Sequence, residues 1–355
     1  MFQRFIMIIA IILTTTAIQS VAFAQSARVS AEQWWPWPSQ DPKKSIPAEK
    51  IPALDLDTKS ITVSGISAGA YMATQLQIAY SSSIAGVGSV AGGPWNCADG
   101  MVWRAQSDCM NNPNSINITA LADQLKSAEK ARDVDSLANL KNARLYIYNS
   151  ETDGVVRPPM RKKNIEFFEK FIPRANIKVE QDLRSAHGFP TVDYGVECGL
   201  AQAPYLMKCN YDTAGEIFKH LYSNRGLSKK QMNANSMVVV DQTEFTDDSS
   251  LLASEGWLYV PAACRKSGAN CRLHVALHGC LQSGENIKDI FAIHSGYNEW
   301  AEGSNIVVLY PQARKSMMNP NACFDWFGYT GGNYAVKSGR QMMAIKAMID
   351  RLAGL

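Results

Sequence analysis

The sequence lacks several features that point to common classes of protein. It has no marked excess of charge of one sign, since 35 Lys and Arg stand against 32 Asp and Glu. A nearly balanced chain offers no field that would attract nucleic acid or an anionic membrane surface. It also has no C-x-x-C pair of the kind found in zinc sites. We therefore expect neither a nucleic-acid partner nor a bound metal.

Long apolar runs are scarce, and the one near the N-terminus indicates export. The run "IMIIAIIL" follows the single charge of Arg4, and Ala22-Phe23-Ala24 forms an A-x-A cleavage signal. We predict a signal peptide over residues 1–24 and a secreted protein, extracellular or periplasmic. No other stretch approaches the roughly 18 apolar residues of a membrane span, so we expect no membrane association after cleavage.

Cysteines are few and even in number, and an oxidising compartment favours their pairing as disulfides. Nearest neighbours would close three short loops and leave one long one, although spacing alone does not fix connectivity. The expected pairs are Cys97–Cys109, Cys198–Cys209, Cys264–Cys271 and Cys280–Cys323.

The rest of the chain divides into an N-terminal arm and one large domain. Residues 25–57 are rich in Trp and Pro, and the cluster Trp34, Trp35 and Trp37 is either an adhesive patch or an anchor to the domain's own core. Residues 58–355 alternate strand-like and helix-like segments, and several of the strands are continuously apolar. This pattern predicts a single α/β domain with a mostly parallel sheet and helices on both faces.

The predicted elements can be given by residue number. The strand-like segments are 60–65, 84–90, 143–149, 177–181, 236–241, 256–261, 272–279 and 305–311. The helix-like segments are 68–81, 118–132, 158–171, 213–223, 286–302 and 337–353.

A serine occupies a tight strand-to-helix turn in "ITVSGISAGAYMATQLQ", residues 61–77. Ser67 lies between Gly65 and Gly69 in a G-x-S-x-G pattern, where small neighbours permit a strained backbone. The helix that follows points its free N–H groups at the hydroxyl. Ser67 is therefore a candidate nucleophile, with the N–H of Ala68 as an oxyanion donor. A glycine-rich turn that merely contains serine is the alternative.

A nucleophilic serine needs a base and an acid, and the chain has only five histidines. His187 lies in a loop, "RSAHGFPT", whereas His220, His274 and His294 fall within predicted helices or a strand. Asp153 follows a buried strand, and the order Ser67, Asp153, His187 is that of α/β hydrolases. We therefore predict a Ser67–His187–Asp153 triad, with Glu151 and Asp193 as alternative acids.

The oxyanion loop of an α/β hydrolase usually precedes the nucleophile. Here the matching "LHVALHGC" ends at Cys280, far beyond Ser67. The early strands of the fold therefore look moved to the C-terminus, as circular permutation would produce. Termini that lie close together tolerate such a change.

Four motifs in this order resemble the polyhydroxybutyrate depolymerases of the circularly permuted, single-domain type. They are "GISAGAYMA", "HGFPT", "LHGC" and "CFDWFGYTGG". The resemblance implies an α/β-hydrolase fold, hydrolysis of short-chain polyhydroxyalkanoate esters without a cofactor, and an oxyanion hole built from the N–H groups of Ala68 and Cys280. It further implies that Trp326 lines the substrate crevice and that the partner is a polyester or oligoester. We expect the protein to be a monomer.

Two other functions remain open from sequence. A feruloyl or acetylxylan esterase would share every catalytic residue and differ only in its crevice. A non-catalytic polymer- or surface-binding protein would use the Trp-rich arm as its adhesive, but it would have no need of an intact triad.

Overall fold

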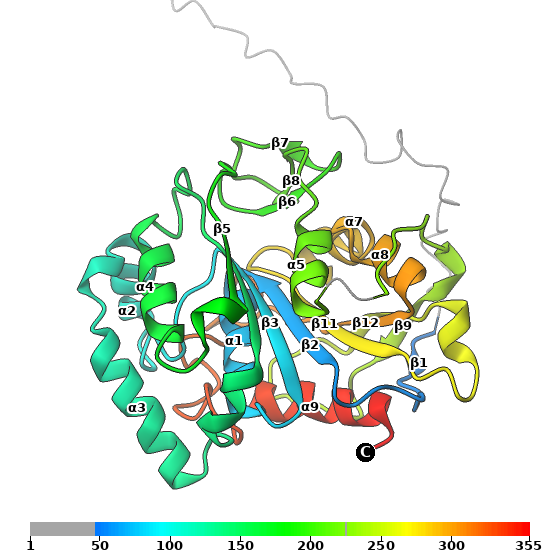
Figure 1. Cartoon of the computed structure of the whole chain (residues 1–355), viewed down its shortest axis with the longest axis horizontal. Helices are drawn as coiled ribbons and strands as arrows, with labels where there is room; N and C mark the ends of the chain where they lie inside the picture. The colour runs from blue at the N-terminus through cyan, green and yellow to red at the C-terminus, as the bar shows by residue number, and fades with distance from the viewer. Residues whose placement is uncertain (1–46, 224–225) are drawn as a thin grey trace, which may run out of the picture. The chain divides into compact units, whose positions relative to one another are not determined.

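The computed structural model describes residues 47–223 and 226–355 (Figure 1). The predicted signal peptide and most of the Trp-rich arm, including Trp34, Trp35 and Trp37, lie outside the described residues. The predicted division at residue 24 and the two hypotheses for the arm therefore stay predictions. The last residues of the segment 25–57 are described: Glu49 and Lys50 pair with Val240 and Asp241, and Leu56 forms an isolated β-bridge to Cys271.

Two sheets form the framework of the described unit. The large sheet has nine strands in the order β1-β9-β10-β12-β11-β2-β3-β4-β5, and the small one has three in the order β6-β8-β7. All neighbours from β12 to β5 run parallel, whereas β10 is antiparallel to both of its neighbours. This confirms the mostly parallel sheet expected from the apolar strands.

The large sheet has eight strands that match predicted segments to within about two residues at each end, and a ninth, β1, that falls in the predicted N-terminal arm and was not expected. The nine are β1 (Glu49–Lys50), β2 (Ile61–Ile66), β3 (Ile84–Val90), β4 (Arg144–Tyr148), β5 (Ile177–Glu180), β9 (Met237–Asp241), β10 (Glu255–Tyr259), β11 (Arg272–Leu277) and β12 (Ile306–Tyr310). The small sheet contains β6 (Phe189–Thr191), β7 (Val196–Glu197) and β8 (Leu206–Lys208). Short extended segments of this length carry little periodicity, so the small sheet was not expected.

The helices follow the strands along the chain. They are α1 (Ala68–Ala79), α2 (Val102–Arg104), α3 (Ile118–Ala131), α4 (Pro159–Phe168), α5 (Thr213–Leu221), α6 (Gly284–Ile287), α7 (Ile290–His294), α8 (Tyr297–Ser304) and α9 (Arg340–Ala353). A π-helical turn, Ala105–Asn111, continues α2.

One predicted helix is wrong. The segment 286–302 forms three short helices, α6, α7 and α8, because Lys288 and Gly296 adopt positive φ angles of 55° and 88°. An α-helix cannot continue through a left-handed residue. His294 is consequently the last residue of a five-residue helix and does not lie in the middle of a long one.

Alternate side chains of the parallel strands enter two separate apolar cores. Leu145 and Ile147 of β4 pack with α1, α3, α4 and α9, whereas Tyr146 and Tyr148 pack with α5, α7 and α8. A strand buried on both faces has this pattern because successive side chains point to opposite sides. The sheet is thus covered by helices on both faces, as predicted.

The segment that follows the first described strand contacts the C-terminal helix α9. Leu54 donates its N–H to the carbonyl oxygen of Leu352, 2.9 Å away, and β1 pairs with β9 in the large sheet. The beginning and the end of the described chain therefore meet, which a circular permutation requires. The permutation itself stays a prediction.

Four disulfides cross-link the unit, and the described residues contain no free cysteine. The pairs are Cys97–Cys109, Cys198–Cys209, Cys264–Cys271 and Cys280–Cys323, as the spacing suggested. Disulfides of this number indicate an oxidising compartment. Within residues 47–223 and 226–355, no helix has the length and apolar character needed to cross a membrane.

A buried polar network lies beneath the strand that leads to Ser67. The ring nitrogens of His274 lie 2.7 Å from the hydroxyls of Thr62 and Ser64 on β2. Those hydroxyls are in turn bonded to Tyr222 and Tyr297. Complete burial lowers the pKa of His274 to about 3, so the imidazole is neutral when the protein is folded.

Acid should destabilise the protein through His274. Its pKa is about 3 in the folded state against an ordinary 6.5, so the unfolded state binds more protons between these values. The free energy of unfolding should therefore fall as pH decreases through that window, by up to about 1.4 kcal/mol per pH unit. His274→Asn should flatten this dependence in urea unfolding measured from about pH 6 to pH 4. Parallel curves for the two proteins would contradict the assignment, whatever their absolute stabilities.

Candidate active site

Ser67 occupies the sharp turn between β2 and α1 with a φ of 55°. Its two glycine neighbours make that turn possible. A Cβ on Gly65 would lie 2.3 Å from the carbonyl carbon of Gly69. A Cβ on Gly69 would lie 2.4 Å from the carbonyl oxygens of Leu277, the last residue of β11, and of His278 directly after it. The glycines of the G-x-S-x-G pattern are thus steric requirements of this fold.

The structure brings the three predicted triad residues together. The Nε2 atom of His187 lies 3.0 Å from the Ser67 hydroxyl, and its Nδ1 lies 2.8 Å from a carboxylate oxygen of Asp153. The other Asp153 oxygen accepts hydrogen bonds from the N–H groups of Val155 and Val156, at 2.7 and 2.9 Å. With the carboxylate as acceptor, Nδ1 donates its proton and Nε2 is left free to accept one from the hydroxyl.

The remaining histidines and acids are engaged elsewhere. His274 belongs to the buried network, and burial lowers the pKa of His278 and His294 to about 4. His220 lies 2.9 Å from the carbonyl oxygen of Asn176. Of the alternative acids, Glu151 forms an ion pair with Arg161 and Asp193 is exposed. Among the described residues, no group of three His, Cys, Asp or Glu side chains could hold a metal ion.

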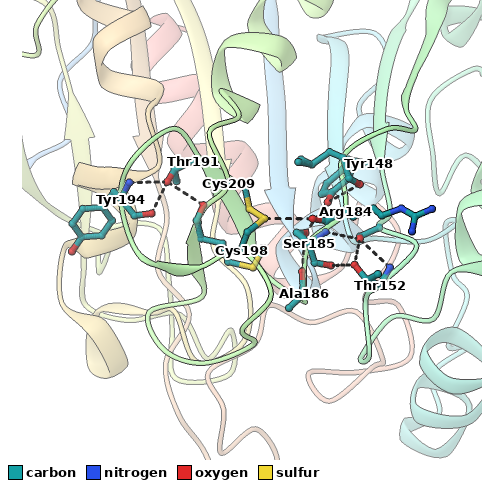
Figure 2. The surroundings of a disulfide bond; sticks show 12 residues. Tyr148, Thr152, Arg184, Ser185, Ala186, Thr191, Tyr194, Cys198 and Cys209 are labelled. Carbon is teal, nitrogen blue, oxygen red and sulfur yellow. Dashed lines mark hydrogen bonds between the residues drawn. A yellow bond between two sulfur atoms is a disulfide. The ribbon is translucent and has the colours of Figure 1, made fainter. Parts of the chain in front are cut away.

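A hydrogen-bonded brace joins the His187 loop to the Asp153 loop (Figure 2). The N–H of Ser185 donates to the Ser150 hydroxyl at 2.9 Å, and the Thr152 hydroxyl donates to the Ser185 carbonyl at 2.9 Å. The Ser185 hydroxyl lies 2.7 Å from that of Tyr148. Ser185 lies two residues before His187, and Thr152 lies one residue before Asp153. These bonds therefore fix the relative position of the two loops.

The segment that contains Cys280, the second candidate oxyanion donor, lies beside the turn that holds Ser67. His278 donates from Nδ1 to the Gly279 carbonyl at 2.7 Å and accepts at Nε2 from the N–H of Ala313 at 3.2 Å. A Cβ on Gly279 would lie 3.4 Å from the Cβ of Ser67, so the segment 279–280 runs directly past the serine.

Both candidate oxyanion donors are unpaired in the part of the chain that the structure describes. Ala68 is the first residue of α1, so its N–H has no acceptor within the helix. The Cys280 N–H likewise donates to no described residue. Two free N–H groups beside a serine can stabilise an oxyanion.

A disulfide links the oxyanion segment to the loop that contains Trp326. Cys280 bonds to Cys323, and the ring of Trp326 stacks on Tyr71 of α1 with 4.4 Å between ring centroids. Trp326 is buried and its Nε1 has no hydrogen-bond partner among the described residues. A buried donor without an acceptor is costly, which suits a position that contacts substrate.

Asp325 organises that loop. One carboxylate oxygen accepts from the N–H groups of Phe327, Gly328 and Tyr329, and the other accepts from the N–H and hydroxyl of Thr330. Burial raises the pKa of Asp325 in spite of these bonds. The carboxylate thereby closes the turn that presents Trp326 to Tyr71.

Sequence reasoning missed the residues that position the site. Ser185, Asp325 and Gln282 each make at least three hydrogen bonds, yet none has a side chain that marks it as catalytic. Asp325 lies inside the motif "CFDWFG", and Gln282 lies two residues after the motif "LHGC". A buried polar residue in or beside a site motif was therefore the available signal.

Comparisons with known proteins find depolymerases. The chain is 39% identical over 309 residues to a poly(3-hydroxybutyrate) depolymerase of Delftia acidovorans, covering 86% of this chain and 62% of that protein. It is 33% identical over 322 residues to a polyhydroxybutyrate depolymerase of Talaromyces funiculosus, covering 86% of this chain and 93% of that one. No family model matches the chain.

Solved structures agree with the sequence relatives. A PHB depolymerase serine-to-alanine variant in complex with an R3HB trimer superposes with a TM-score of 0.80 at 33% identity. The PHB depolymerase of Penicillium funiculosum superposes with a TM-score of 0.78 at 33% identity. Each match covers 86% of this chain and 99% of the other. The α/β-hydrolase fold expected from the motifs is thereby confirmed.

Gly69→Ala should disrupt the turn between β2 and α1 that holds Ser67. The new Cβ would meet two backbone carbonyl oxygens at 2.4 Å, which no side-chain movement relieves. We expect the protein to lose about 1–3 kcal/mol of stability, as for other overpacked sites. The control is Gly199→Ala, where a Cβ meets nothing within 4 Å. Chemical denaturation checks this, and equal stability of the two variants would contradict the steric account.

Proposed function

The chain belongs to the family of polyhydroxybutyrate depolymerases, and from that premise we propose that it is a secreted serine esterase acting on short-chain polyhydroxyalkanoates. The preferred substrate is poly(3-hydroxybutyrate) or its oligomers. The observation that carries the proposal is the chain of hydrogen bonds from Ser67 through His187 to Asp153. The chain spans 62% of the length of the Delftia relative. We therefore propose the activity for this chain and do not take it over from that longer protein.

The proposed reaction is acyl transfer in two steps. His187 accepts the Ser67 proton at Nε2 as the serine oxygen attacks the ester carbonyl, and Asp153 stabilises the imidazolium that forms. The proton then passes from His187 to the departing alcohol, which leaves an acyl-enzyme. Water activated by the same histidine hydrolyses that acyl-enzyme and restores the serine. No cofactor takes part in these steps.

The oxyanion of each tetrahedral intermediate would be held by the N–H groups of Ala68 and Cys280. The N-terminus of the 12-residue helix α1 adds a favourable dipole at the same point. A donor of this kind contributes about 3–4 kcal/mol in comparable sites. Trp326 would line the crevice, with its unpaired Nε1 directed at an ester oxygen of the substrate.

Export and a monomeric state complete the proposal. Four disulfides support synthesis into an oxidising compartment, extracellular or periplasmic, after removal of residues 1–24. We propose that the mature protein acts as a monomer on a polyester or oligoester, with neither nucleic acid nor a membrane as partner.

Product analysis tests the proposed substrate. The protein should release hydroxybutyrate monomer or oligomers from amorphous poly(3-hydroxybutyrate) and cleave short p-nitrophenyl esters. A feruloyl ester and acetylated xylan serve as comparison substrates in the same assay. Faster turnover of either one than of hydroxybutyrate oligomers would overturn the substrate assignment while leaving the serine chemistry intact.

Substitution of the triad should separate its three roles. Ser67→Ala and His187→Ala should each lower kcat by about 10⁶. Asp153→Asn should lower it by about 10⁴, because the base survives in a poorer tautomer. Turnover of a p-nitrophenyl ester measures the loss, with Ser127→Ala and Asp123→Asn on the exposed face of α3 as controls. Near wild-type turnover in Asp153→Asn would show that another group orients the base.

Trp326→Phe should reveal a contact with substrate. Phenylalanine keeps the stacking on Tyr71 but removes the indole N–H, and one hydrogen bond is worth roughly 1 kcal/mol. We expect KM for hydroxybutyrate oligomers to rise about fivefold while kcat changes little. The matched control is Trp300→Phe, which removes an indole N–H bonded to Asp212 and away from the triad. An unchanged KM in Trp326→Phe would remove the indole from the binding site.

A further inference from the structure

The side chain of Gln282 connects the oxyanion segment to a distant segment, Pro204–Tyr205, that supports the His187 loop. It is 1% exposed, and its amide uses both ends. The Oε1 atom accepts the N–H of Gly279 at 2.8 Å. The Nε2 group donates to the carbonyl oxygens of Pro204 and Tyr205, at 3.0 and 3.1 Å. Since a backbone N–H can only donate and a carbonyl can only accept, the amide has one orientation that satisfies all three.

The first of these bonds reaches the oxyanion segment. Gly279 directly precedes Cys280, whose N–H is the second proposed oxyanion donor. The carbonyl of Gly279 is already held by His278, so the bond from Gln282 fixes its N–H as well. With both backbone groups of Gly279 bound, the peptide that carries the Cys280 N–H has little freedom to rotate.

The other two bonds reach the residues just before β8, on which the backbone after His187 packs. The Tyr205 carbonyl also accepts the N–H of Phe189 at 2.8 Å. A Cβ on Gly188 would lie 2.7 Å from the same oxygen. The backbone directly after His187 therefore rests on Tyr205, at the point where β6 pairs with β8 in the small sheet (Figure 1).

We propose that Gln282 is a positioning residue that sets the distance between the oxyanion hole and the His187 base. This inference rests on the proposed function, because it assigns Gln282 a part in the same acyl-transfer chemistry. The small sheet and the large sheet each carry part of the site, and one buried amide spans them. Misplacement of catalytic groups by about 1 Å can cost about 10²-fold in rate, so loss of this link should be visible in kcat.

Gln282→Met is the main test, since methionine has similar length and no amide. Gln242 provides a matched control. Its amide is also fully buried, accepts the N–H of Gln312 and donates to the carbonyls of Ala253 and Gln312. It makes the same three kinds of bond but touches neither catalytic loop. The measurements are kcat and KM on a soluble p-nitrophenyl ester, thermal stability, and affinity for an alkyl boronic acid that mimics the tetrahedral intermediate.

Gln282→Met should lower kcat by about 10²-fold with KM little changed, and weaken boronic acid binding in the same proportion. Gln242→Met should lose similar stability but keep kcat and boronic acid affinity. Retention of kcat in Gln282→Met, or equal losses of kcat in the two variants, would overturn the proposal.

A second variant keeps the test decisive if methionine prevents folding. Gln282→Glu has nearly the same shape and keeps an acceptor for Gly279, but a carboxyl group offers at most one proton for the Pro204 and Tyr205 carbonyls, where the amide offers two. It should also lose kcat, and wild-type kcat in this variant would equally overturn the proposal.

A phosphonofluoridate probe distinguishes this proposal from the proposed function. Such a probe labels an activated serine whatever ester the enzyme prefers. If the wild-type protein is labelled at Ser67 but cleaves no hydroxybutyrate ester, the substrate assignment fails and the role of Gln282 is still tested by its labelling rate. A labelling rate unchanged in Gln282→Met would overturn the positioning role alone.

Discussion

The contact on which the site depends is the close approach of α1 to the end of β11. Gly69 lies so near the carbonyl oxygens of Leu277 and His278 that no side chain fits between them. That contact holds the nucleophile turn and the oxyanion segment at one separation. It also explains why Ser67 accepts a φ of 55°, since packing on both sides leaves the strained turn no room to relax.

Around that contact the site is assembled from loops that the large sheet alone does not order. The Asp153 loop and the His187 loop are joined by Ser150, Thr152 and Ser185. A disulfide from Cys280 to Cys323 joins the oxyanion segment to the loop of Trp326. Both links join segments that are far apart in the sequence, and each restricts the movement of the loops that it joins. Preorganisation of this kind is what electrostatic catalysis needs, because the donors do not have to reorient during the reaction.

The interior also contains buried polar groups whose hydrogen bonds fix their positions. His274 and His278 are both buried and neutral, and each bonds through both ring nitrogens. One supports the strand that leads to Ser67, and the other supports the segment that carries the Cys280 N–H. Buried polar groups with all their partners give a region one defined arrangement, which a catalytic site requires more than a core does.

Much of this protein could be read from its sequence because the relevant signals are local. Apolar runs predicted the parallel strands, the G-x-S-x-G turn predicted a serine at a strand end, and cysteine spacing suggested the four disulfides. The order of Ser67, Asp153 and His187 indicated which acid and base belong together, and the structure brings those three side chains into hydrogen-bond contact. The circular permutation stays a prediction, although Leu54 and Leu352 meet as it requires.

What only the tertiary structure decided depends on contacts between distant segments. The predicted helix over 286–302 breaks at Lys288 and Gly296. The packing of three short helices against the sheet overrides the local helix propensity of this segment. The positioning role proposed for Gln282 rests on bonds to Gly279 and to Tyr205, and no spacing rule relates those residues. Periodicity and motifs describe neighbours along the chain, whereas a hydrogen bond between two loops exists only once folding has brought both loops to the same place.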